Sequence, residues 1–322
     1  MSKLHEKSPC CNASIRLFGE RRRQCAVCQR TWRIWKKNRG RKKNRFHFEP
    51  LFHYFEKKLK NTRLQKRTFS ARLRLILEKF NTETPWPKIP DGPLIVVADG
   101  LIEYFGNKKY AVYFILIRSI SDSKAYIFPP YMRAEGEVVL GWKEAFAKLP
   151  NEVLGRICAL VCDGHTGLVY LAKAHGWRLQ RCHFHLIYNI AHFSSFGLLN
   201  QTNNRGLRIK NLVQVVLYHK DPEAISLALV ALQKIKDSVI SRVFKTVISG
   251  FLKHYEDYRT YLKFPQYCLP STSNSVEFLN SQIRDLQYRA RGFRTPKSFF
   301  SWIIGFCKYR KFVTCRGKNQ PN

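Results

Sequence analysis

The stretch Leu94-Ile95-Val96-Val97-Ala98-Asp99-Gly100 is an apolar run, rich in β-branched residues, that ends in an Asp-Gly step. Short apolar runs of this composition are typical of buried β-strands. A second run, Ile157-Cys158-Ala159-Leu160-Val161-Cys162, ends in the same way at Asp163-Gly164. The repetition predicts two buried strands, each with an aspartate at its C-terminal end and a glycine that leaves room beside it.

Between these runs the sequence predicts two more strands and a helix. Residues 110–117 and 125–128 are rich in β-branched and aromatic side chains, and residues 138–149 carry apolar side chains at helical spacing. A ribonuclease H-like fold begins with the order βββαβ, although the spacing alone also permits other α/β sheets. Residues 168–262 are expected to be almost wholly helical. We therefore expect an α/β fold with an all-helical block that interrupts or follows the sheet.

The charge of the chain points to nucleic acid. Of 322 residues, 57 are Lys or Arg and 22 are Asp or Glu, which gives a formal net charge of +35. A surface of this charge is expected to bind a polyanion. A merely basic protein, such as a ribosomal component, is the alternative, but 45% of the residues are hydrophobic, enough for a sizeable core. The composition therefore favours a large globular protein that binds nucleic acid.

The apolar segments of the sequence give an expectation for where the protein is located. No segment offers the roughly twenty uninterrupted apolar residues of a membrane span, and residues 1–5 lack a signal-peptide pattern. We expect a cytoplasmic protein associated with the nucleoid, in which thiols stay reduced and cysteines act as metal ligands or buried thiols. Five cysteines without paired spacing are expected to be buried thiols: Cys158, Cys162, Cys268, Cys307 and Cys315.

The N-terminal cysteines predict a zinc ribbon. Cys25-Ala26-Val27-Cys28 is a Cys-x-x-Cys knuckle, whereas the other half has the adjacent pair Cys10 and Cys11 after Ser8-Pro9. Cys11 fits the ribbon pattern, and Cys10 would substitute for the missing ligand. His5 is an alternative fourth ligand, and a basic flap that has lost its metal is another interpretation. We expect Zn²⁺ at this site.

Shifts in composition divide the chain into segments. A basic run occupies residues 39–45, and four prolines in residues 81–93 preclude a regular element. The expected segments are a basic zinc-ribbon module (1–48), a helix-turn-helix that binds DNA (49–83), a linker (84–93), the first part of the core (94–190), a helical insertion (191–270), and a core return helix with a basic C-terminus (271–322).

Asp99 and Asp163 are expected to lie together at one edge of the sheet. Carboxylate oxygens there can hold Mg²⁺ or Mn²⁺, which makes phosphate chemistry possible. Taken singly, an Asp-Gly step is more often a turn dipeptide than a metal ligand. The pairing of two such steps in a strongly basic chain favours a metal site.

Three segments resemble the bacterial insertion-sequence transposases of the Mutator class: 161–168 (VCDGHTGL), 180–189 (QRCHFHLIYN) and 271–284 (STSNSVEFLNSQIR). The resemblance covers residues 94–312 and implies a ribonuclease H-like core with a helical insertion between the second Asp and a third acid, Glu277. It also implies two Mg²⁺ or Mn²⁺ ions at Asp99, Asp163 and Glu277. One ion would activate water or a DNA 3′-hydroxyl, and the other would stabilise the leaving oxygen.

The segment around Glu277 also has a physical interpretation. Ser271–Ser273 offer N-caps for a helix on which Glu277, Asn280 and Arg284 share one stripe. Its core-facing residues would be Val276, Leu279 and Ile283. Such a helix can deliver Glu277 to the edge of the sheet. A solvated surface carboxylate is the alternative for Glu277, and Asp285 is a competitor that spacing does not exclude.

Cys182 and His185 match the Cys-x-x-His signature of the family, and their i, i+3 spacing puts them on one helix face. We interpret them as support for the active site or as DNA contacts. A Cys-His nucleophile pair would need an orienting partner and an acyl-type substrate, and a buried packing pair is the other alternative. His165 and His183 flank these motifs and are left out of the catalytic set.

Basic residues near both ends of the chain are expected to contact DNA phosphates, which positions the protein without reading sequence. They are Arg21, Arg22, Arg23, Arg41, Lys42, Lys43, Arg284, Arg289 and Arg291.

The leading hypothesis is a transposase that cleaves and transfers strands with metal ions. Its partners would be the terminal inverted repeats of its element and target DNA, and pairing two ends implies a homodimer or higher oligomer. The first alternative is a catalytically inactive DNA-binding regulator derived from a transposase. A recombinase with a nucleophilic Tyr or Ser is a third class, which the 15 tyrosines do not exclude by count.

Overall fold

The structure is a computed structural model that describes residues 7–18, 22–33, 48–56, 66–195, 203–238 and 242–314. The chain divides into two compact units, Met1–Phe48 and Glu49–Asn322. Several residues singled out in the sequence lie outside the described ranges: His5, Arg21, Arg41, Lys42, Lys43 and Cys315. No helix in the described ranges is long and apolar enough to cross a membrane.

The first unit is a small antiparallel sheet of β1 (Ile15–Leu17), β2 (Arg22–Cys25) and β3 (Thr31–Arg33), with β2 in the middle. Among its described residues only Ser8 and Cys25 are buried. So little buried surface cannot hold a fold of this size together by the hydrophobic effect alone. A unit of this kind needs a cross-link or a metal.

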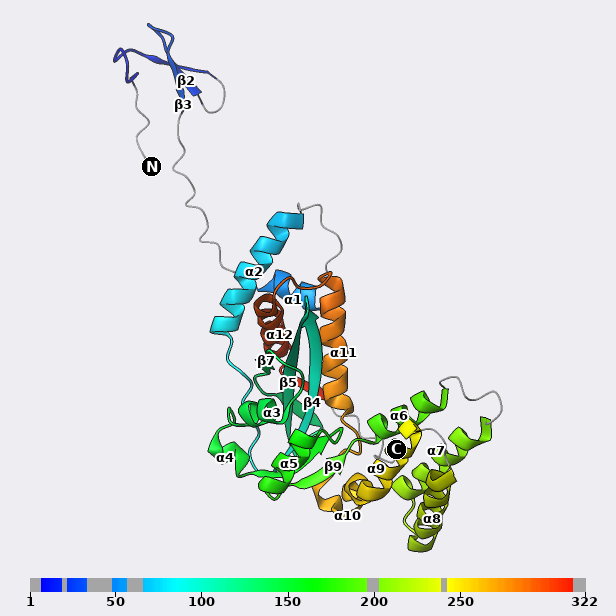
Figure 1. Ribbon diagram of the computed structural model, residues 1–322. Helices are drawn as coiled ribbons and strands as arrows, with labels where there is room; N and C mark the ends of the chain where they lie inside the picture. Colours follow the sequence, from blue (N-terminus) through cyan, green and yellow to red (C-terminus); the bar gives the residue numbers. More distant parts are fainter. Residues whose placement is uncertain are drawn as a thin grey trace, which may run out of the picture. The chain divides into compact units, whose positions relative to one another are not determined.

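The second unit is built on a mixed sheet (Figure 1). Its strands are β4 (Leu94–Phe105), β5 (Lys108–Ser119), β6 (Lys124–Ile127), β7 (Tyr131–Arg133), β8 (Ile157–Cys162), β9 (Arg178–Arg181) and β10 (Phe312–Thr314). The order is β10-β6-β5-β4-β8-β9, and β7 pairs with β5. β4 and β5 form a long antiparallel hairpin, whereas β8 runs parallel to β4 and β9 parallel to β8.

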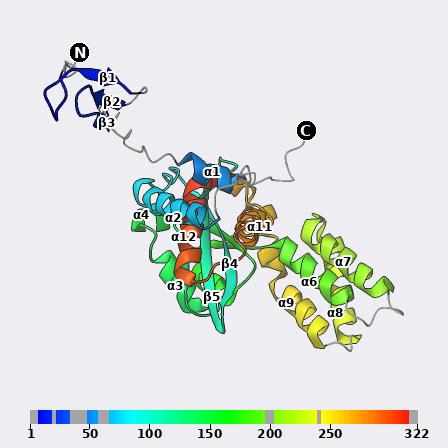
Figure 2. The same cartoon turned by 90° about the horizontal axis from the view of Figure 1, so that it is seen from above.

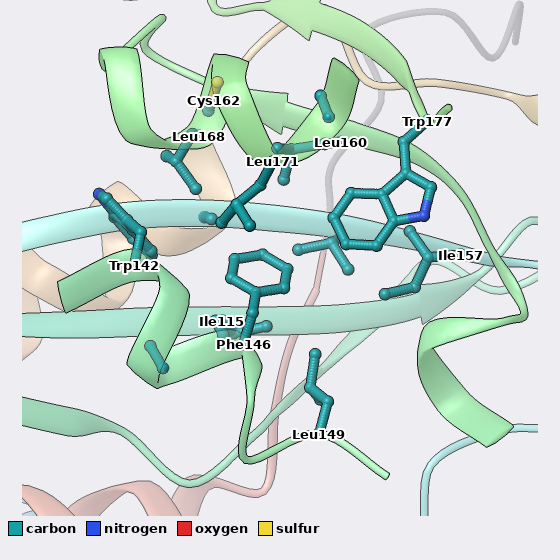
Figure 3. Close-up of a cluster of buried hydrophobic side chains, with 14 of the residues drawn as sticks. Ile115, Trp142, Phe146, Leu149, Ile157, Leu160, Cys162, Leu168, Leu171 and Trp177 are labelled. Carbon is teal, nitrogen blue, oxygen red and sulfur yellow. The ribbon is translucent and has the colours of Figure 1, made fainter. Parts of the chain in front are cut away.

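Helices α3 (Val139–Phe146), α4 (Asn151–Leu154) and α5 (Thr166–Ala174) follow the first strands. The main hydrophobic core lies between the sheet and α3 and α5, where Trp142, Phe146, Leu171 and Trp177 converge (Figure 3). Trp142 is fully buried. Burying a large apolar side chain contributes about 1.5–3 kcal/mol relative to leaving it exposed, so this cluster is a main source of the stability of the unit.

The opposite face of the sheet is covered by α11 (Asn274–Arg289) and α12 (Pro296–Arg310). Leu94, Val96 and Ala98 belong to the α3 and α5 core. Because side chains alternate along a strand, the odd-numbered residues of β4 face α11 and α12. The Phe105 ring packs 5.5 Å from that of Phe299 on α12, in agreement with this assignment.

The segment predicted to be a helix-turn-helix forms α1 (Glu49–Phe55) and α2 (Lys66–Glu83). Both helices belong to the same compact unit as the sheet. They pack on α12, where Phe55 contacts Phe306 and the Asn81 side chain donates a 2.9 Å hydrogen bond to the Ser301 carbonyl. Their role as a DNA-reading element stays a prediction.

The long helical segment holds four main helices, α6 (His183–Ser195), α7 (Asn203–Tyr218), α8 (Pro222–Ser238) and α9 (Arg242–Tyr258). They enclose a second core of their own and form a lobe beside the sheet (Figure 2). α10 (Thr260–Lys263) and a short 3-10 turn lead back to α11. The expectation that residues 168–262 are almost wholly helical is wrong at β9, a polar strand of the sheet.

Candidate active site

Asp99 lies on β4, and Asp163 directly follows β8, the parallel strand beside it. The last paired residues of the parallel ladder are Val97 and Val161, and each aspartate follows two positions later. The two carboxylates are therefore neighbours at one edge of the ladder, and the strand alternation puts Asp99 on the face that α11 covers. The sequence predicted that the first strand ends at Asp99, and this prediction is wrong for β4. The strand continues to Phe105 because its hairpin with β5 runs past the end of β8.

Gly164 meets a steric requirement after Asp163. Its φ is 99°, and a Cβ there would lie 2.6 Å from the Arg181 guanidinium, so a larger residue would be strained. The Asp163 carboxylate accepts a 2.8 Å hydrogen bond from the His165 backbone N–H. The His165 ring caps α5 by accepting from the Gly167 N–H at 3.1 Å. The turn thus fixes the Asp163 carboxylate and occupies His165 Nδ1 with a hydrogen bond.

Helix α11 approaches Asp99 directly. The Asn280 side-chain amide donates a 2.8 Å hydrogen bond to Asp99 Oδ2. Glu277 stands one turn earlier on the same stripe, as the sequence predicted, and the core-facing residues Val276, Leu279 and Ile283 are buried as expected. Ser273 occupies the N-cap position without making a capping bond. Its hydroxyl instead donates to Glu277 Oε1 at 2.7 Å.

The Glu277 carboxylate faces Cys182 and His185. Its Oε1 lies 3.6 Å from Cys182 Sγ and 3.5 Å from His185 Nδ1. Within the described ranges, these three residues are one of two groups of at least three potential ligands whose atoms lie within 4.8 Å of one another; the other is Cys10, Cys11, Cys25 and Cys28. The carboxylates of Asp99, Asp163 and Glu277 do not form such a group, although the charges of Asp163 and Glu277 both act on Asp99.

The charges at this site perturb one another. Burial raises the pKa of Asp99 to about 7, with a further contribution from the Asp163 carboxylate, while His185 opposes the shift. Smaller contributions in the same upward direction come from Glu137 and Glu277. Like charges held together away from water disfavour ionisation unless a cation joins them. The carboxyl groups of Asp99, Asp163, Glu137 and Glu277 therefore influence one another electrostatically.

Glu137 is a fourth acid at this site that the sequence analysis missed. Tyr113 fixes the backbone around it, because its hydroxyl donates to the Gly136 carbonyl at 3.3 Å and accepts from the Val138 N–H at 3.2 Å. Glu137 Oε1 accepts a 2.8 Å hydrogen bond from the Trp142 indole. Burial raises its pKa, and Asp163 adds to the rise.

The glycine after Asp99 leaves space for the Glu137 carboxylate. A Cβ on Gly100 would lie 2.7 Å from Glu137 Oε2. The same carboxylate lies 3.8 Å from His165 Nδ1. In the sequence, Glu137 stands just before a predicted helix, where an acid is common because it favours the helix N-terminus. Only the fold places it against Gly100, so no sequence signal distinguished it.

Cys182 is a buried thiol rather than an activated nucleophile. Burial raises its pKa to about 11, although the Ser273 hydroxyl and N–H oppose that rise. At neutral pH it is protonated and poorly nucleophilic. His183, beside it, is buried, with its Nε2 2.7 Å from the Tyr258 carbonyl, and burial lowers its pKa to about 4. His183 therefore anchors α6 to α9 and carries no charge at neutral pH.

The other cysteines expected to be buried behave differently from one another. Cys162 and Cys307 are buried, Cys158 is half-buried, and Cys268 is exposed. The prediction of a buried thiol is therefore wrong for Cys268, which lies in a turn with a φ of 47°.

The four N-terminal cysteines converge, the irregular pair included. Cys10 Sγ lies 3.3 Å from Cys28 Sγ, and the Cys25 thiol donates to the buried Ser8 hydroxyl at 3.2 Å. The hydrogen bond with Ser8 lowers the pKa of Cys25 to about 6, whereas that with Cys28 raises the pKa of Cys11 to about 12. Four sulfurs at this spacing match the donor set of a tetrahedral zinc site.

Arg284 and Arg291 are exposed near the C-terminal end of α11. They line a surface hollow of about 740 Å³ together with Arg289 and the exposed Tyr288. Arg289 is engaged within the fold, since its Nε lies 3.2 Å from Asp285 Oδ2 and its guanidinium stacks over the Tyr54 ring. Asp285, the alternative to Glu277 as the third acid, is thus engaged in an ion pair with Arg289. Arg22 and Arg23 lie on β2 of the first unit.

A family model described as "Transposase, Mutator family" matches residues 127–306, more than half of the chain. The matched span contains Glu137, Asp163, Cys182, His185 and Glu277, and it begins after Asp99. No curated protein matches the chain significantly. The match covers β7, β8, β9 and the helices from α3 into α12, and because it spans more than half of the chain it shows that the chain belongs to the Mutator family of transposases.

Proposed function

We propose that this chain cleaves DNA strands and transfers their ends with divalent metal ions bound by Asp99, Asp163 and Glu277. The observation that carries the proposal is that Asp99 on β4 and Asp163, directly after the adjacent parallel strand β8, are close enough for one charge to act on the other, with α11 bonded to Asp99 through Asn280. The sheet order β6-β5-β4-β8-β9 and the helical lobe inserted between Asp163 and Glu277 support a ribonuclease H-like core.

The residues at this edge fit a hard divalent cation. Carboxylate oxygens are the ligands that Mg²⁺ and Mn²⁺ prefer. The pKa of Asp99 is raised by burial first and by the Asp163 carboxylate second, and a cation would neutralise that neighbouring charge. When bound, such ions polarise phosphate oxygens and activate the attacking hydroxyl. Asn280 orients the Asp99 carboxylate, and the turn at Gly164 holds that of Asp163.

The remaining parts of the chain support binding of DNA. The donor set of Cys10, Cys11, Cys25 and Cys28 fits structural Zn²⁺, which would supply the cross-link that the first unit lacks. Arg22 and Arg23 on the ribbon, and Arg284 and Arg291 beside the hollow on α11, offer guanidinium groups to the phosphate backbone. A dimer or higher oligomer would hold two element ends together.

The decisive experiment is cleavage and joining of DNA that carries the terminal inverted repeats of the element, with Mg²⁺ or Mn²⁺. Asp99→Asn, Asp163→Asn and Glu277→Gln should each lower the rate by at least about a hundredfold, since each removes a ligand charge. Asp285→Asn is the matched control on the same helix and should stay active. An active variant among the three would remove that residue from the site.

Two other outcomes separate the alternatives. Specific binding of the ends without cleavage under any divalent ion would make the chain a DNA-binding regulator. A covalent protein-DNA adduct formed in the presence of EDTA would instead identify a Tyr or Ser recombinase.

A further inference from the structure

The described part of the chain contains a cluster of metal-ligand type of which the proposed function uses only Glu277. It consists of Cys182, His185 and Glu277, whose ligand atoms all lie within 4.8 Å of one another. Cys182 directly follows β9 and His185 lies in the first turn of α6, while Glu277 lies in the first turn of α11. Two segments far apart in the sequence, the β9–α6 junction and the start of α11, thus bring one sulfur, one nitrogen and one oxygen close together.

We propose that Cys182, His185 and Glu277 bind a zinc ion, or another borderline divalent transition metal, as a second metal site beside the Asp99–Asp163 pair. Magnesium prefers an all-oxygen shell, whereas a thiolate, an imidazole and a carboxylate together suit zinc. The inference does not depend on strand transfer, because it concerns a different ion and different ligands apart from the shared Glu277.

The separations of Glu277 Oε1 from the other two ligand atoms agree with a tetrahedral zinc site. Metal–ligand lengths of about 2.0–2.3 Å in a tetrahedron separate the ligand atoms by about 3.3–3.8 Å. Glu277 Oε1 lies 3.6 Å from Cys182 Sγ and 3.5 Å from His185 Nδ1. The Cys182 thiol is within hydrogen-bond distance of Glu277 Oε1, whereas the 3.5 Å to His185 Nδ1 is long for a direct hydrogen bond. An ion between the three atoms would replace both contacts with metal–ligand bonds.

His185 Nδ1 is the atom that most needs a partner. It is buried and has no hydrogen bond. An unsatisfied buried polar atom costs about 1–3 kcal/mol, and a metal ion at the centre of the cluster would remove that cost. The ring nitrogen of a neutral histidine is a common zinc ligand.

Ser273 orients two of the three ligands. Its backbone N–H donates to Cys182 Sγ at 3.2 Å, and its hydroxyl donates to Glu277 Oε1 at 2.7 Å. Hydrogen bonds of this kind fix the direction of metal ligands and stabilise their charged forms. Ser273 is itself fully buried, and the backbone N–H of His183 bonds to the Ser271 carbonyl at 3.0 Å. The ligands are therefore held before any ion binds.

Binding would proceed with loss of the Cys182 thiol proton to solvent, because the thiolate is the ligand form. Three protein ligands leave one coordination position for water. The ion would join the start of α6 to the start of α11 and would hold Glu277 at a fixed position beside Asp99. The site would then set the geometry of the third acid.

Zinc content of the full-length protein tests the proposal. With the N-terminal cysteines holding one ion, the wild-type chain should retain about two zinc ions after dialysis in zinc-free buffer. Cys182→Ser and Cys25→Ser should each retain about one, and the double variant about none. Cys158→Ser is the matched control, a half-buried thiol outside the cluster, and it should keep both ions.

Substitution of Co²⁺ for zinc provides a second readout, since thiolate ligation gives Co²⁺ a charge-transfer band. In the Cys25→Ser variant this band should persist, and it should disappear when His185→Gln is added. His185 is chosen because it is partly exposed, so the fold should tolerate a substitution there better than at the buried Cys182. Zinc in the wild type that Cys25→Ser abolishes completely would overturn the proposal. So would unchanged zinc in both Cys182→Ser and His185→Gln. Neither result would bear on Mg²⁺-dependent cleavage, which is measured separately.

Discussion

Asn280 holds Asp99 across 181 positions of sequence, because its side-chain amide donates a 2.8 Å hydrogen bond to Asp99 Oδ2. The bond joins the middle of α11 to the middle of β4 and aligns the helix stripe that also carries Glu277. A hydrogen bond to a charged group contributes about 1.5–3 kcal/mol. The geometry of the acids therefore depends on a residue that is not itself an acid.

Asn280→Ala should lower the rate of DNA cleavage by about 10- to 100-fold, which is the kinetic equivalent of losing that hydrogen bond. The fold should survive, since Val276, Leu279 and Ile283 still anchor the helix. Single-turnover cleavage rates at saturating Mg²⁺ provide the measurement. Asn274→Ala, at an exposed position of the same helix, is the control; equal rates for the two variants would show that Asn280 does not position Asp99.

The raised pKa of Asp99 predicts a pH-dependent stability in the absence of Mg²⁺. Because Asp99 titrates near pH 7 in the fold and near about 3.9 when unfolded, the native state binds more protons between these values. Stability should therefore fall as the pH rises through this window, by up to about 4 kcal/mol. Below the window Asp99 is protonated in both states and the effect is absent.

Urea denaturation of the Mg²⁺-free protein at about pH 5 and about pH 8 measures this effect. Asp99→Asn cannot ionise and should lose less stability over the same interval than the wild type. Other titrating groups, such as His183, are common to both proteins and cancel in the comparison. Added Mg²⁺ should restore wild-type stability at the higher pH. Identical pH profiles for the two proteins would contradict the raised pKa.

Much of the fold follows from sequence periodicity, and the exceptions have physical causes. The strand before Asp163 was predictable because it is a short continuous apolar run, and the helix that carries Glu277 was predictable because its buried residues repeat at the period of a helix. β9, Arg178–Arg181, has no such signal because it is a polar edge strand. Its buried Gln180 side chain bonds to the Tyr258 carbonyl at 2.9 Å and accepts from the Tyr261 N–H at 2.9 Å, partners that only the fold supplies.

The candidate site was predictable to the same extent. The two Asp-Gly steps singled out Asp99 and Asp163 because an apolar run followed by Asp-Gly is a local pattern, although only Asp163 stands at the end of its strand. Glu137 leaves none, since its place depends on Tyr113 and Trp142 in the folded core. The orientation of Glu277 toward Cys182 was equally unpredictable from sequence, because it depends on the hydrogen bonds between residues 271–273 and the start of α6.

Glu137 should influence the ionisation of Asp99. Glu137→Gln removes one negative charge while its amide oxygen can still accept from the Trp142 indole. The pKa of Asp99 should fall, because Glu137 contributes to its rise. The lower limb of the pH–rate profile for cleavage should then shift toward lower pH. Glu135→Gln, an exposed carboxylate paired with Arg133, should leave the profile unchanged; a profile that does not move in Glu137→Gln would place that residue outside the site.

Trp142 should be among the most destabilising positions in the sheet core. It is fully buried, meets the Tyr113 ring edge-on at 4.9 Å, and bonds to Glu137. Trp142→Ala should cost about 3–5 kcal/mol of unfolding free energy, since it leaves a large cavity. Trp142→Phe should cost less, because most of the volume remains. Leu140→Ala, half-exposed on the same helix, is the control in equilibrium urea denaturation, and a similar loss there would contradict this assignment.

The arginines on and just after α11 should differ in what they contribute, some to DNA binding and one to the stability of the fold. Arg284 and Arg291 are exposed, so the double variant Arg284→Ala/Arg291→Ala should weaken DNA binding for all sequences alike. Each lost phosphate contact should reduce the slope of log binding constant against log salt by about one. Arg289→Ala should instead lower the stability of the fold, because Arg289 pairs with Asp285 and stacks over Tyr54.

Fluorescence anisotropy over a salt series measures the slopes, and urea denaturation measures the stabilities of the same variants. Lys234→Ala, an exposed cation on α8, controls for the general loss of positive charge. An unchanged slope in the double variant would exclude the hollow on α11 as a phosphate contact. A changed slope in Arg289→Ala without loss of stability would show that its guanidinium leaves Asp285 to bind DNA.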